Sequence, residues 1–525
     1  MKHSSTPNCS LQTAIFPLPS LILLLVLGCH SPAAAQYSGV YELNGGTARE
    51  SSQTYAATAV DQSSVYVLNS GNLTLVSCTM TKTGDASSTD SASQYGLNAG
   101  VLANSAGKVT ILGGSVTTNA LGGNGLFASG SGSSISMSNG TISASGGNAH
   151  GVDATYTGSI SLTDVDVTTN GASSSALATD FGGGTVTVNG GTIVSADTAA
   201  NSHSAGIYST GTIQVTGATV SSLGDCGGVI DGANSILLTN TSLTGKVEGI
   251  KLWKTAPATG AATVTISGGS LTATAGDAIY VTGETGNAAT ASITASNGAA
   301  ISAGTGNIIH VIQSSTGTFA ATGETLSGNL YADSTSTLTV TLRSHTSLTG
   351  KAQMAAVAID STSTWTVTAN SILTTLNDSS GISGTSVTNI TGNGHDVHYD
   401  SSLTGNRYLG GLTYNLINGG VLTPGSMGIA EAQAQPIAIR QSPIVNLPNP
   451  FSRTTSIAYE LRERSHVRLT VTNLSGQQVA TLLDETRDAG RYETRFDGSK
   501  LASGIYLVRL SADGVDATRK MIVRR

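Results

Sequence analysis

The sequence of 525 residues has little aromatic character, little charge and few cysteines. Aromatic residues make up 4% of it and charged residues 10%, and there are four cysteines. Nucleic-acid binding is excluded for the long central part, because phosphate recognition needs clustered Lys and Arg. The cysteines are too few for a disulfide framework. No helical pattern of useful length stands outside the first thirty residues.

Short apolar stretches and glycine dominate instead. There are 65 glycines, and 39% of the residues are hydrophobic, mostly Val, Ile, Leu and Ala in alternation with polar residues. Alternation with period two and frequent turn residues predict many short β-strands. The charge is unevenly divided, since residues 440–525 carry +5 and the other 439 residues carry −12. We therefore expect an all-β chain with a distinct C-terminal part.

The N-terminus has the pattern of a secretory signal peptide over residues 1–35. Lys2 precedes the apolar run "LILLLVLG" (21–28), and Ala33 to Ala35 form a small-residue cleavage site. The alternative is lipoprotein processing at Cys29, because "VLGC" resembles a lipobox. The apolar run is too short to remain as a membrane span. Either route predicts export and no transmembrane segment after signal removal.

A repeat fills most of the chain between residues 73 and about 372. Its pattern is two alternating apolar residues, a Gly, Asn or Asp corner and a further apolar residue. Clear copies are "VTILGGSV" (109), "ISMSNGTI" (135), "ISLTDVDV" (160), "VTVNGGTI" (186), "IQVTGATV" (213), "ILLTNTSL" (236) and "VTISGGSL" (264). With looser copies there are 12, at intervals of 23 to 28 residues between the clear ones. Such a period marks a repeat architecture in which stacked units share one core.

Each unit contains three short strands and three corners, which corresponds to one coil of a parallel β-helix. A strand such as "GIYS" (206) precedes the motif strand, and another such as "SVTT" (115) follows the corner. We predict a solenoid of about 12 or more coils over residues 36–425. Coils stack about 4.8 Å apart, so Cys78 and Cys226, about five coils apart, would be roughly 24 Å from each other. That distance excludes a disulfide, and both should be free buried thiols.

This part of the chain resembles secreted right-handed parallel β-helix proteins of the pectate-lyase-like superfold. The segment "HYDSSLTGNRYLGGLTYNLINGGVLTPG" (398–425) is similar to the terminal segment of surface proteins of that kind. The resemblance implies a fold, not an activity, because this fold carries lyases, hydrolases and adhesins.

Catalytic and metal-binding patterns are sparse. Enzymes of this fold resemble one another in their clustered carboxylates, but Asp153, Asp164 and Asp166 have no Arg nearby, and we interpret them as turn residues. We expect no cofactor and no metal, and we assign no catalytic residue. An alternative metal site is "HDVHYD", where Asp396, His398 and Asp400 would share one side of a strand. Polar capping of the solenoid end explains them more simply.

Aromatic residues recur at one position of the coil. In the leading strands the residue between two apolar positions should point outward. Down the coils this position is occupied by Tyr66, Leu102, Phe127, Asp153, Ala178, Tyr208, Ile230, Lys251, Tyr280, His310, Tyr331 and Ala358. Exposed rings in a row could stack on sugars. We therefore name Tyr66, Phe127, Tyr208, Lys251, Tyr280, His310 and Tyr331 as candidate ligand-binding residues, with ordinary strand-surface packing as the alternative.

The C-terminal part has a different residue pattern, without the repeat. Residues 426–445 have no period and are predicted to be a linker. Residues 446–525 contain amphipathic strands separated by short turns, such as "HVRLTVTNL" (466–474) and "GIYLVRLSAD" (504–513). About seven antiparallel strands in some 80 residues predict a small Ig-like β-sandwich.

These residues resemble the C-terminal sorting domain of type IX secretion cargo. The similarity rests on "LPNPF" (447–451), "NLSGQQV" (473–479), "AGRYETRFDGSKLASGIYLVRL" (489–510) and "RKMIVRR" (519–525). It implies passage through the outer membrane by the type IX machinery, with attachment to surface lipopolysaccharide or release. The candidate sorting-signal residues are Pro448, Asn449, Pro450, Gly476, Gly504 and Lys520, with turn geometry as the alternative for the glycines.

The sequence therefore predicts an exported β-helix protein at the cell surface or outside a Gram-negative bacterium. Its central part would have a structural or adhesive role and could bind extracellular glycans. The alternative is a polysaccharide lyase or glycoside hydrolase on the same fold.

Overall fold

The computed structural model describes residues 37–425 apart from 200–201, 256–258 and 285–286. It also describes residues 444–524 apart from 448, 450, 462–463, 474–476, 489 and 513–514. The predicted signal peptide and most of the predicted linker lie outside these residues. Contacts divide the chain into two units, residues 1–427 and 428–525.

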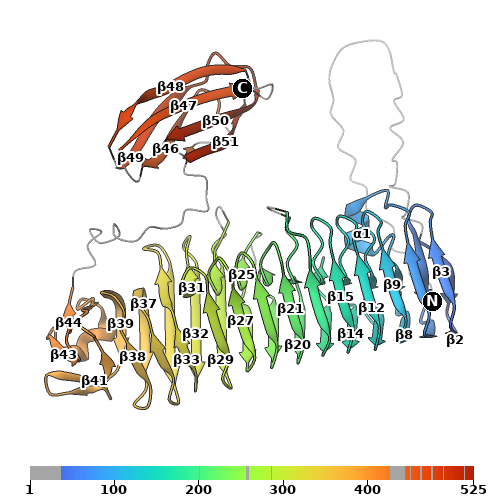
Figure 1. Cartoon of the computed structure of the whole chain (residues 1–525), viewed down its shortest axis with the longest axis horizontal. Helices are drawn as coiled ribbons and strands as arrows, with labels where there is room; N and C mark the ends of the chain where they lie inside the picture. Colours follow the sequence, from blue (N-terminus) through green and yellow to red (C-terminus); the bar gives the residue numbers. More distant parts are fainter. Residues whose placement is uncertain are drawn as a thin grey trace, which may run out of the picture. The chain divides into compact units, whose positions relative to one another are not determined.

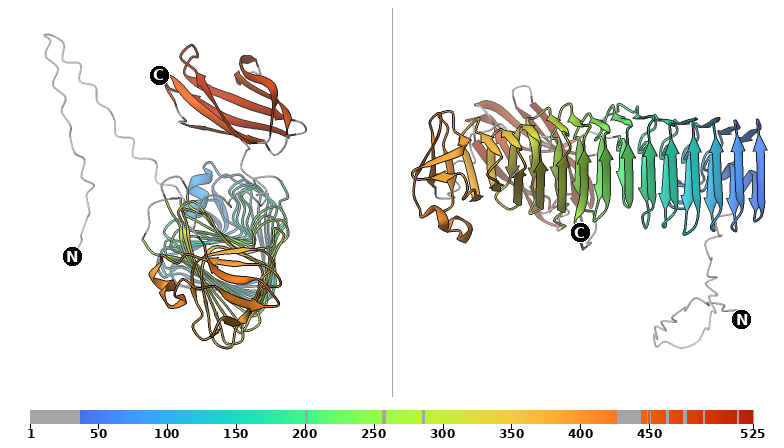
Figure 2. Two further views of the ribbon diagram at one scale, coloured as in Figure 1. Left: turned by 90° about the vertical axis from the view of Figure 1, so that its left-hand side faces the viewer. Right: turned by 90° about the horizontal axis from the view of Figure 1, so that it is seen from below.

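The first unit is a parallel β-solenoid of about 15 turns, as the repeat predicts. Its coils stack side by side in Figure 1 and superpose when viewed down the solenoid axis in Figure 2. Each regular coil contributes one strand to each of three faces, and neighbouring coils pair in parallel.

The first face consists of β1 (Ser38–Asn44), β4 (Gln62–Leu68), β7 (Val101–Asn104), β10 (Leu126–Ser129), β13 (Val152–Thr155), β16 (Leu177–Asp180), β19 (Ile207–Ser209), β22 (Gly228–Asp231), β25 (Ile250–Trp253), β28 (Ile279–Val281), β31 (Asn307–Val311) and β34 (Asn329–Ala332). The second face consists of β2 (Thr47–Ser51), β5 (Asn72–Val76), β8 (Lys108–Leu112), β11 (Ser134–Ser138), β14 (Ser159–Thr163), β17 (Thr185–Asn189), β20 (Thr212–Thr216), β23 (Ser235–Thr239), β26 (Ala262–Ser267), β29 (Thr290–Ser296), β32 (Thr316–Thr322) and β35 (Thr337–Arg343). The third face consists of β3 (Thr54–Ala57), β6 (Thr79–Lys82), β9 (Ser115–Thr118), β12 (Thr141–Ala144), β15 (Asp166–Thr169), β18 (Thr192–Ser195), β21 (Thr219–Ser222), β24 (Ser242–Gly245), β27 (Ser270–Ala273) and β30 (Ala300–Ala303).

The last coils are less regular. They contain β33 (Thr325–Ser327), β36 (Ser347–Thr349), β37 (Ala352–Ile359), β38 (Thr364–Thr366), β39 (Ser371–Asn377), β40 (Ile382–Ser383), β41 (Ser386–Thr391), β42 (Val397–Tyr399), the 3-10 helix η1 (Thr404–Leu409), β43 (Tyr414–Ile417) and β44 (Val421–Pro424). Two antiparallel pairs, β40 with β41 and β43 with β44, interrupt the parallel stacking at this end. A buried Trp365 donates its indole N–H to the Gly350 carbonyl, 2.9 Å away.

Alternation of apolar and polar residues builds the core. In β8, Val109 and Ile111 point inward and are buried, and they stack in register on Ile135 and Met137 of the next coil. Because the coils repeat this register, one continuous hydrophobic core runs through the solenoid. Cys78 and Cys226 are buried and free, as predicted.

The corner after each motif strand requires a left-handed backbone. Gly113 and Gly114 have φ of 66° and 85°, and Asn139 in the next coil has φ of 52°. Glycine adopts this region without strain, and Asn and Asp enter it more readily than other residues. This requirement explains why Gly, Asn and Asp alternate at the corner of the repeat.

A short α-helix lies in the first unit, although the sequence shows no helical pattern of useful length there. Residues 83–100 leave the solenoid between β6 and β7 and contain α1 (Thr89–Tyr95). Ser88 caps its N-terminus by accepting a hydrogen bond from Ser91 N, and Gly96, with φ of 73°, ends it. A Ser cap and a terminal Gly are readable helix signals, but seven residues are too few for a hydrophobic period. No helix among the described residues is long and apolar enough to span a membrane.

The second unit is an antiparallel β-sandwich. One sheet contains β45 (Ile444–Leu447), β46 (Thr454–Leu461) and β49 (Gly490–Asp497). The other contains β48 (Gln478–Arg487), β47 (Ser465–Asn473), β50 (Gly504–Ala512) and β51 (Val515–Val523). Buried residues from both sheets, including Ile457, Leu469 and Val508, form one core. The all-β fold class is therefore confirmed for both units.

Candidate functional site

The predicted candidate residues of the first face lie in one row. Backbone pairing places Tyr66, Leu102, Phe127, Asp153, Ala178, Tyr208, Val229, Lys251, Tyr280, His310, Tyr331 and Gln353 opposite one another on consecutive coils. Two positions differ from the sequence alignment. Val229 and Gln353 occupy the row, whereas Ile230 is buried in the core and Ala358 pairs with the second face. Val229 and Ile230 are both apolar, so alternation could not distinguish them.

The N-terminal end of this row is covered, so the expected exposure of Tyr66 and Phe127 was wrong. Tyr66 is 4% exposed and Phe127 is 0% exposed, and both pack with Leu102 and Ala99. The covering segment, residues 83–100, provides Ala99 and Gly96, and a Cβ on Gly96 would collide with the Phe127 ring. These side chains point away from the solenoid core, as alternation predicts, but the covering segment buries them. We call Tyr66, Leu102 and Phe127 the covered row.

The C-terminal end of the row remains partly exposed. Five residues here are half-buried and keep part of their surface open to solvent, in contrast to the covered row. We call them the exposed row: Tyr208, Lys251, Tyr280, His310 and Tyr331. Tyr280 and Tyr331 flank the His310 ring edge to face, with ring centroids 5.3 Å and 4.6 Å from its own. The Lys251 ammonium lies 4.1 Å from the centre of the Trp253 ring. A cation and three rings therefore follow one another along four coils.

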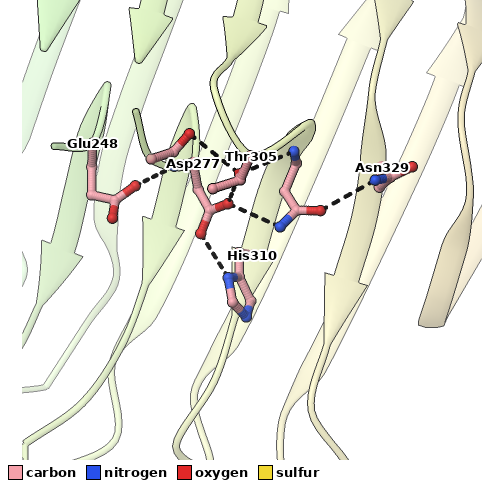
Figure 3. Close-up of polar contacts among 7 residues, drawn as sticks. Glu248, Asp277, Thr305, His310 and Asn329 are labelled. Atoms are coloured by element: carbon pink, nitrogen blue, oxygen red, sulfur yellow. Dashed lines mark hydrogen bonds and ion pairs between the residues drawn. The ribbon is translucent and has the colours of Figure 1, made fainter. Parts of the chain in front are cut away.

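His310 is held by a polar network that the sequence did not reveal. Its Nδ1 lies 2.7 Å from Asp277 Oδ2 (Figure 3). Asn307 donates to Asp277 Oδ1 at 2.9 Å, and Thr305 also donates to that oxygen. Asn329 donates to Asn307 at 3.4 Å, and the Asp277 amide donates to Glu248. Asp277 comes from the loop before β28, while Thr305 precedes β31 and Asn307 begins it, one coil further on. The sequence does not show that these side chains turn toward one another.

The network sets which nitrogen of a neutral His310 ring carries the proton. Burial alone would raise the pKa of Asp277, but the hydrogen bond and the charge interaction with His310, with hydrogen bonds from Thr305 and Asn307, outweigh burial and hold that pKa below its ordinary value. The ionised carboxylate accepts the Nδ1 proton, which assigns the lone pair of a neutral ring to Nε2. No group in the described part of the chain bonds Nε2, and the His310 side chain is 19% exposed. Nε2 can therefore accept a proton or a hydrogen bond from a ligand.

The two tyrosines beside His310 are hydrogen-bond donors at neutral pH. Burial, with nearby acidic groups that include Glu248, Asp277 and Asp333, raises the pKa of Tyr280 to about 12. Burial and Asp333 also raise the pKa of Tyr331. Both phenols thus keep their protons. Glu248 and Asp277 are themselves buried, so the ligand-facing groups are the rings, the phenols and Lys251.

The alternative metal residues at the solenoid end are used for local bonding. Asp396 Oδ1 accepts the Val421 amide at 2.9 Å, and Asp400 Oδ1 accepts the Ser402 amide at 2.9 Å. His398 lies between them on β42 and pairs with Thr423. Among the described residues, the group of His, Asp or Glu close enough to hold a metal is a different one, His150 with Asp153 and Asp180.

The turn interpretation holds for one of the three aspartates, Asp164, which has φ of 51° at a corner. Asp166 instead begins the strand β15, and its Oδ1 accepts the Thr192 amide of the next coil at 2.8 Å. Asp153 also contradicts the turn interpretation, because it lies within β13 on the row itself and is fully buried. The sequence gives no sign of this burial, since residues distant in the chain cover Asp153.

In the second unit, two of the candidate sorting residues are linked. The Asn449 side chain accepts a hydrogen bond from Ile522 N at 2.8 Å and donates one to the Lys520 carbonyl at 2.9 Å. The Lys520 side chain points to solvent. Gly504 begins β50 and pairs with Val523, so it lies in a strand rather than in a turn. Pro448, Pro450 and Gly476 lie outside the described residues.

Comparison with known families assigns the second unit. Residues 447–524 match the family described as secretion system C-terminal sorting domain. This unit is a type IX sorting domain. The sorting domain implies that the chain is exported and interacts with the type IX secretion machinery. Comparison of the whole chain with curated proteins found no match.

Proposed function

We propose that the solenoid is an adhesive module that binds extracellular glycans through the exposed row. The sorting domain directs the solenoid through the outer membrane. The solenoid is then either anchored to surface lipopolysaccharide or released into the medium. The observation that carries the proposal is the in-register sequence of Lys251, Tyr280, His310 and Tyr331 on four consecutive coils. Sugars offer apolar faces to aromatic rings and hydroxyls to hydrogen-bonding groups.

The chemistry of the row favours a sugar over an apolar ligand. The phenols of Tyr280 and Tyr331 donate hydrogen bonds, Nε2 of His310 accepts them, and Lys251 donates further ones. These polar groups alternate with ring surface at the spacing of the coils, about 4.8 Å. A chain of sugar rings laid along the solenoid axis would meet one such group per coil.

Glycan-array binding by the secreted full chain tests the proposal. Tyr280→Ala and Tyr331→Ala should each weaken binding to the selected glycan by about tenfold, because a lost ring contact is worth about 1 kcal/mol or more. Phe181→Ala is the matched control, since that ring is 40% exposed but lies outside the row. Equal losses in all three variants, or none in the two tyrosine variants, would contradict the proposal.

Export is tested separately. Deleting residues 446–525 should leave the protein in the periplasm, as followed by fractionation and surface immunolabelling. Normal surface display of the truncated chain would refute this role of the sorting domain.

A glycan-cleaving activity is the second candidate. The Asp277–His310 pair favours it, because an oriented imidazole can act as a general base. Lys251 pairs in register with Tyr280. The acidic residues Glu248, Asp277 and Asp333 are close enough to raise the pKa of Tyr280. Release of new chain ends from polysaccharides by the secreted protein, abolished in His310→Gln, would favour the enzyme. Binding without turnover would favour the adhesive module.

A further inference from the structure

A buried acidic pair lies in the first face, between the covered row and the exposed row. Asp153 is on β13 and Asp180 ends β16, one coil further on. Together with His150, their oxygen and nitrogen atoms lie within 4.8 Å of one another. Asp153 is 0% exposed, and neither carboxyl oxygen has a hydrogen-bond partner. An ionised carboxylate in such a place would lack both water and a donor, which is strongly unfavourable.

No positive side chain compensates the pair. His150 Nδ1 accepts the Ser175 amide proton at 3.0 Å, so this nitrogen carries no proton and the ring is neutral. Burial lowers the pKa of His150 to about 4, which agrees with a neutral ring. Within the described residues, no Lys or Arg forms an ion pair with Asp153 or Asp180. The missing charge must therefore come from a proton or from a bound cation.

The hydrogen bond to His150 decides against a metal centre. With Nδ1 accepting from Ser175, the proton of the neutral ring is on Nε2. A nitrogen that carries a proton has no lone pair for a metal, and metal-binding histidines instead donate from their second nitrogen. His150 is thus not a metal ligand, because its Nδ1 accepts the Ser175 amide and its Nε2 carries the proton. Two carboxylates alone, one of them fully buried, make a poor cation site.

We propose that Asp153 and Asp180 share one proton, and that this proton holds the covering segment on the first face. Burial, then the charge of Asp180, raises the pKa of Asp153 well above its ordinary value, and the nearby amides of Ala154 and Asp180 only partly oppose this. Burial also raises the pKa of Asp180, against the amide of Phe181 and with a contribution from Asp231. The folded pair therefore keeps a proton at pH values where ordinary aspartates have lost it.

The covering segment rests on the elements that carry the pair. Thr155 of β13 donates to the Gln94 carbonyl of α1 at 3.2 Å. Asn124 donates to the Ala92 carbonyl at 3.2 Å and accepts the His150 amide at 2.7 Å. Charging both carboxylates would disturb β13 and the His150 loop, which lie behind these two hydrogen bonds to α1.

The other titratable groups around the pair do not provide an alternative switch. They are Asp90 and Tyr95 on α1, Tyr208 on β19 and Asp231 on β22. Asp90 and Tyr95 are exposed, and burial raises the pKa of Tyr208. On the other side of Asp153 stands Phe127, which does not titrate.

The sign of the pH dependence follows from the raised pKa values. The unfolded aspartates have a pKa near 3.8, and the folded pair binds its protons more tightly. The stabilisation is therefore complete below about pH 4, falls as the pH rises toward the folded pKa values, and is constant above them. In the falling range the folded pair keeps a proton that the open state has lost, so the opening equilibrium of the covering segment changes about tenfold per pH unit.

Hydrogen exchange of residues 83–100 in the full chain tests the proposal between pH 5 and 9. Comparing each variant with the wild type at the same pH cancels the intrinsic exchange rate. The wild type should lose protection as the pH rises, by about tenfold per unit while the folded pair keeps a proton that the open state has lost. Asp153→Asn and Asp180→Asn should both flatten this loss. Asp164→Asn, which removes an exposed carboxylate at a left-handed corner that Asn tolerates, should behave as the wild type.

Two results would overturn the proposal. One is an equal pH dependence in the wild type and in Asp153→Asn, which would show that no proton on the pair holds the segment. The other is binding of one equivalent of Zn²⁺ or Mn²⁺ by the wild type, measured by calorimetry, that Asp153→Asn abolishes. In that case a cation, not a proton, would neutralise the pair.

Discussion

The two ends of the row on the first face obey one register and have different surroundings. In the covered row, Tyr66, Leu102 and Phe127 are buried by residues 83–100, whereas Tyr280, His310 and Tyr331 in the exposed row are half-buried. The strand positions are equivalent, so the strand pattern does not determine whether a ring is available. A single insertion between two coils makes the difference. Aromatic residues at one end therefore serve stability, while those at the other end can serve recognition.

The largest effect should come from the covered row. Phe127→Ala removes a fully buried ring, and we expect the free energy of unfolding to fall by about 3–5 kcal/mol. Denaturant unfolding of the full chain, followed in the solenoid transition, measures this loss. A loss below about 1 kcal/mol would mean that the covering segment does not pack on the row.

The next effect should come from the support of the exposed row. Asp277→Ala leaves His310, Thr305 and Asn307 without their shared acceptor, and buried groups left in this way cost about 1–3 kcal/mol. The pKa of Asp277 is lowered below 3.8 in the folded state, so its contribution is complete above that pH and is lost as the pH falls further. Unfolding measured at pH 7 and pH 3 should show a smaller difference between wild type and variant at pH 3. A difference that does not change with pH would contradict this assignment.

A smaller effect should follow from changing the end of α1. Gly96→Ala places a side chain at φ of 73° and against the Phe127 ring, and left-handed geometry alone costs about 1–2 kcal/mol. We expect faster proteolysis within residues 83–100 and little change elsewhere. Gly217→Ala is a useful control, because φ is also positive there but a Cβ meets no atom within 4 Å. Equal behaviour of the two variants would argue that backbone strain alone, without the contact to Phe127, explains the effect.

The smallest effect on stability is expected in the exposed row. Tyr331→Ala removes a half-buried ring and should change the free energy of unfolding by about 1 kcal/mol or less, as for most surface substitutions. The same denaturant experiment as for Phe127→Ala gives a direct comparison of the two ends. A loss as large as that of Phe127→Ala would remove the distinction between them.

Local patterns in the sequence predicted the coil, the corners and the direction of most side chains in the row, with Ile230 and Ala358 as the exceptions. The alternation of period two shows the strands, and the repeat of about 25 residues shows the coils. The Gly, Asn and Asp residues at the corners follow from backbone sterics. The burial of an outward-pointing side chain cannot be predicted in this way, because it depends on where residues 83–100 fold back onto the first face. Nothing in the strand of Phe127 distinguishes it from that of Tyr280.

The polar networks were unpredictable for the same reason. Asp277 and His310 are 33 residues apart, and they meet because Asp277, just before β28, lies beside the strand β31 that carries His310. Asp153 looks in the sequence like any other aspartate of a turn-rich protein. Its burial results from Phe127, Ala178 and the covering segment, which belong to other coils. Contacts between side chains of different coils cannot be recognised from the residue pattern of a single coil.

Footprinting of the tyrosines tests most directly whether the exposed row is the ligand-binding surface. Oxidative labelling of the secreted full chain, with and without a glycan selected on the array, reports the accessibility of each ring. We predict that the glycan protects Tyr280 and Tyr331 and leaves Tyr95, an exposed tyrosine of α1, unchanged. Protection of Tyr95 alone, or no protection of Tyr280 and Tyr331 while the glycan is bound, would contradict this account.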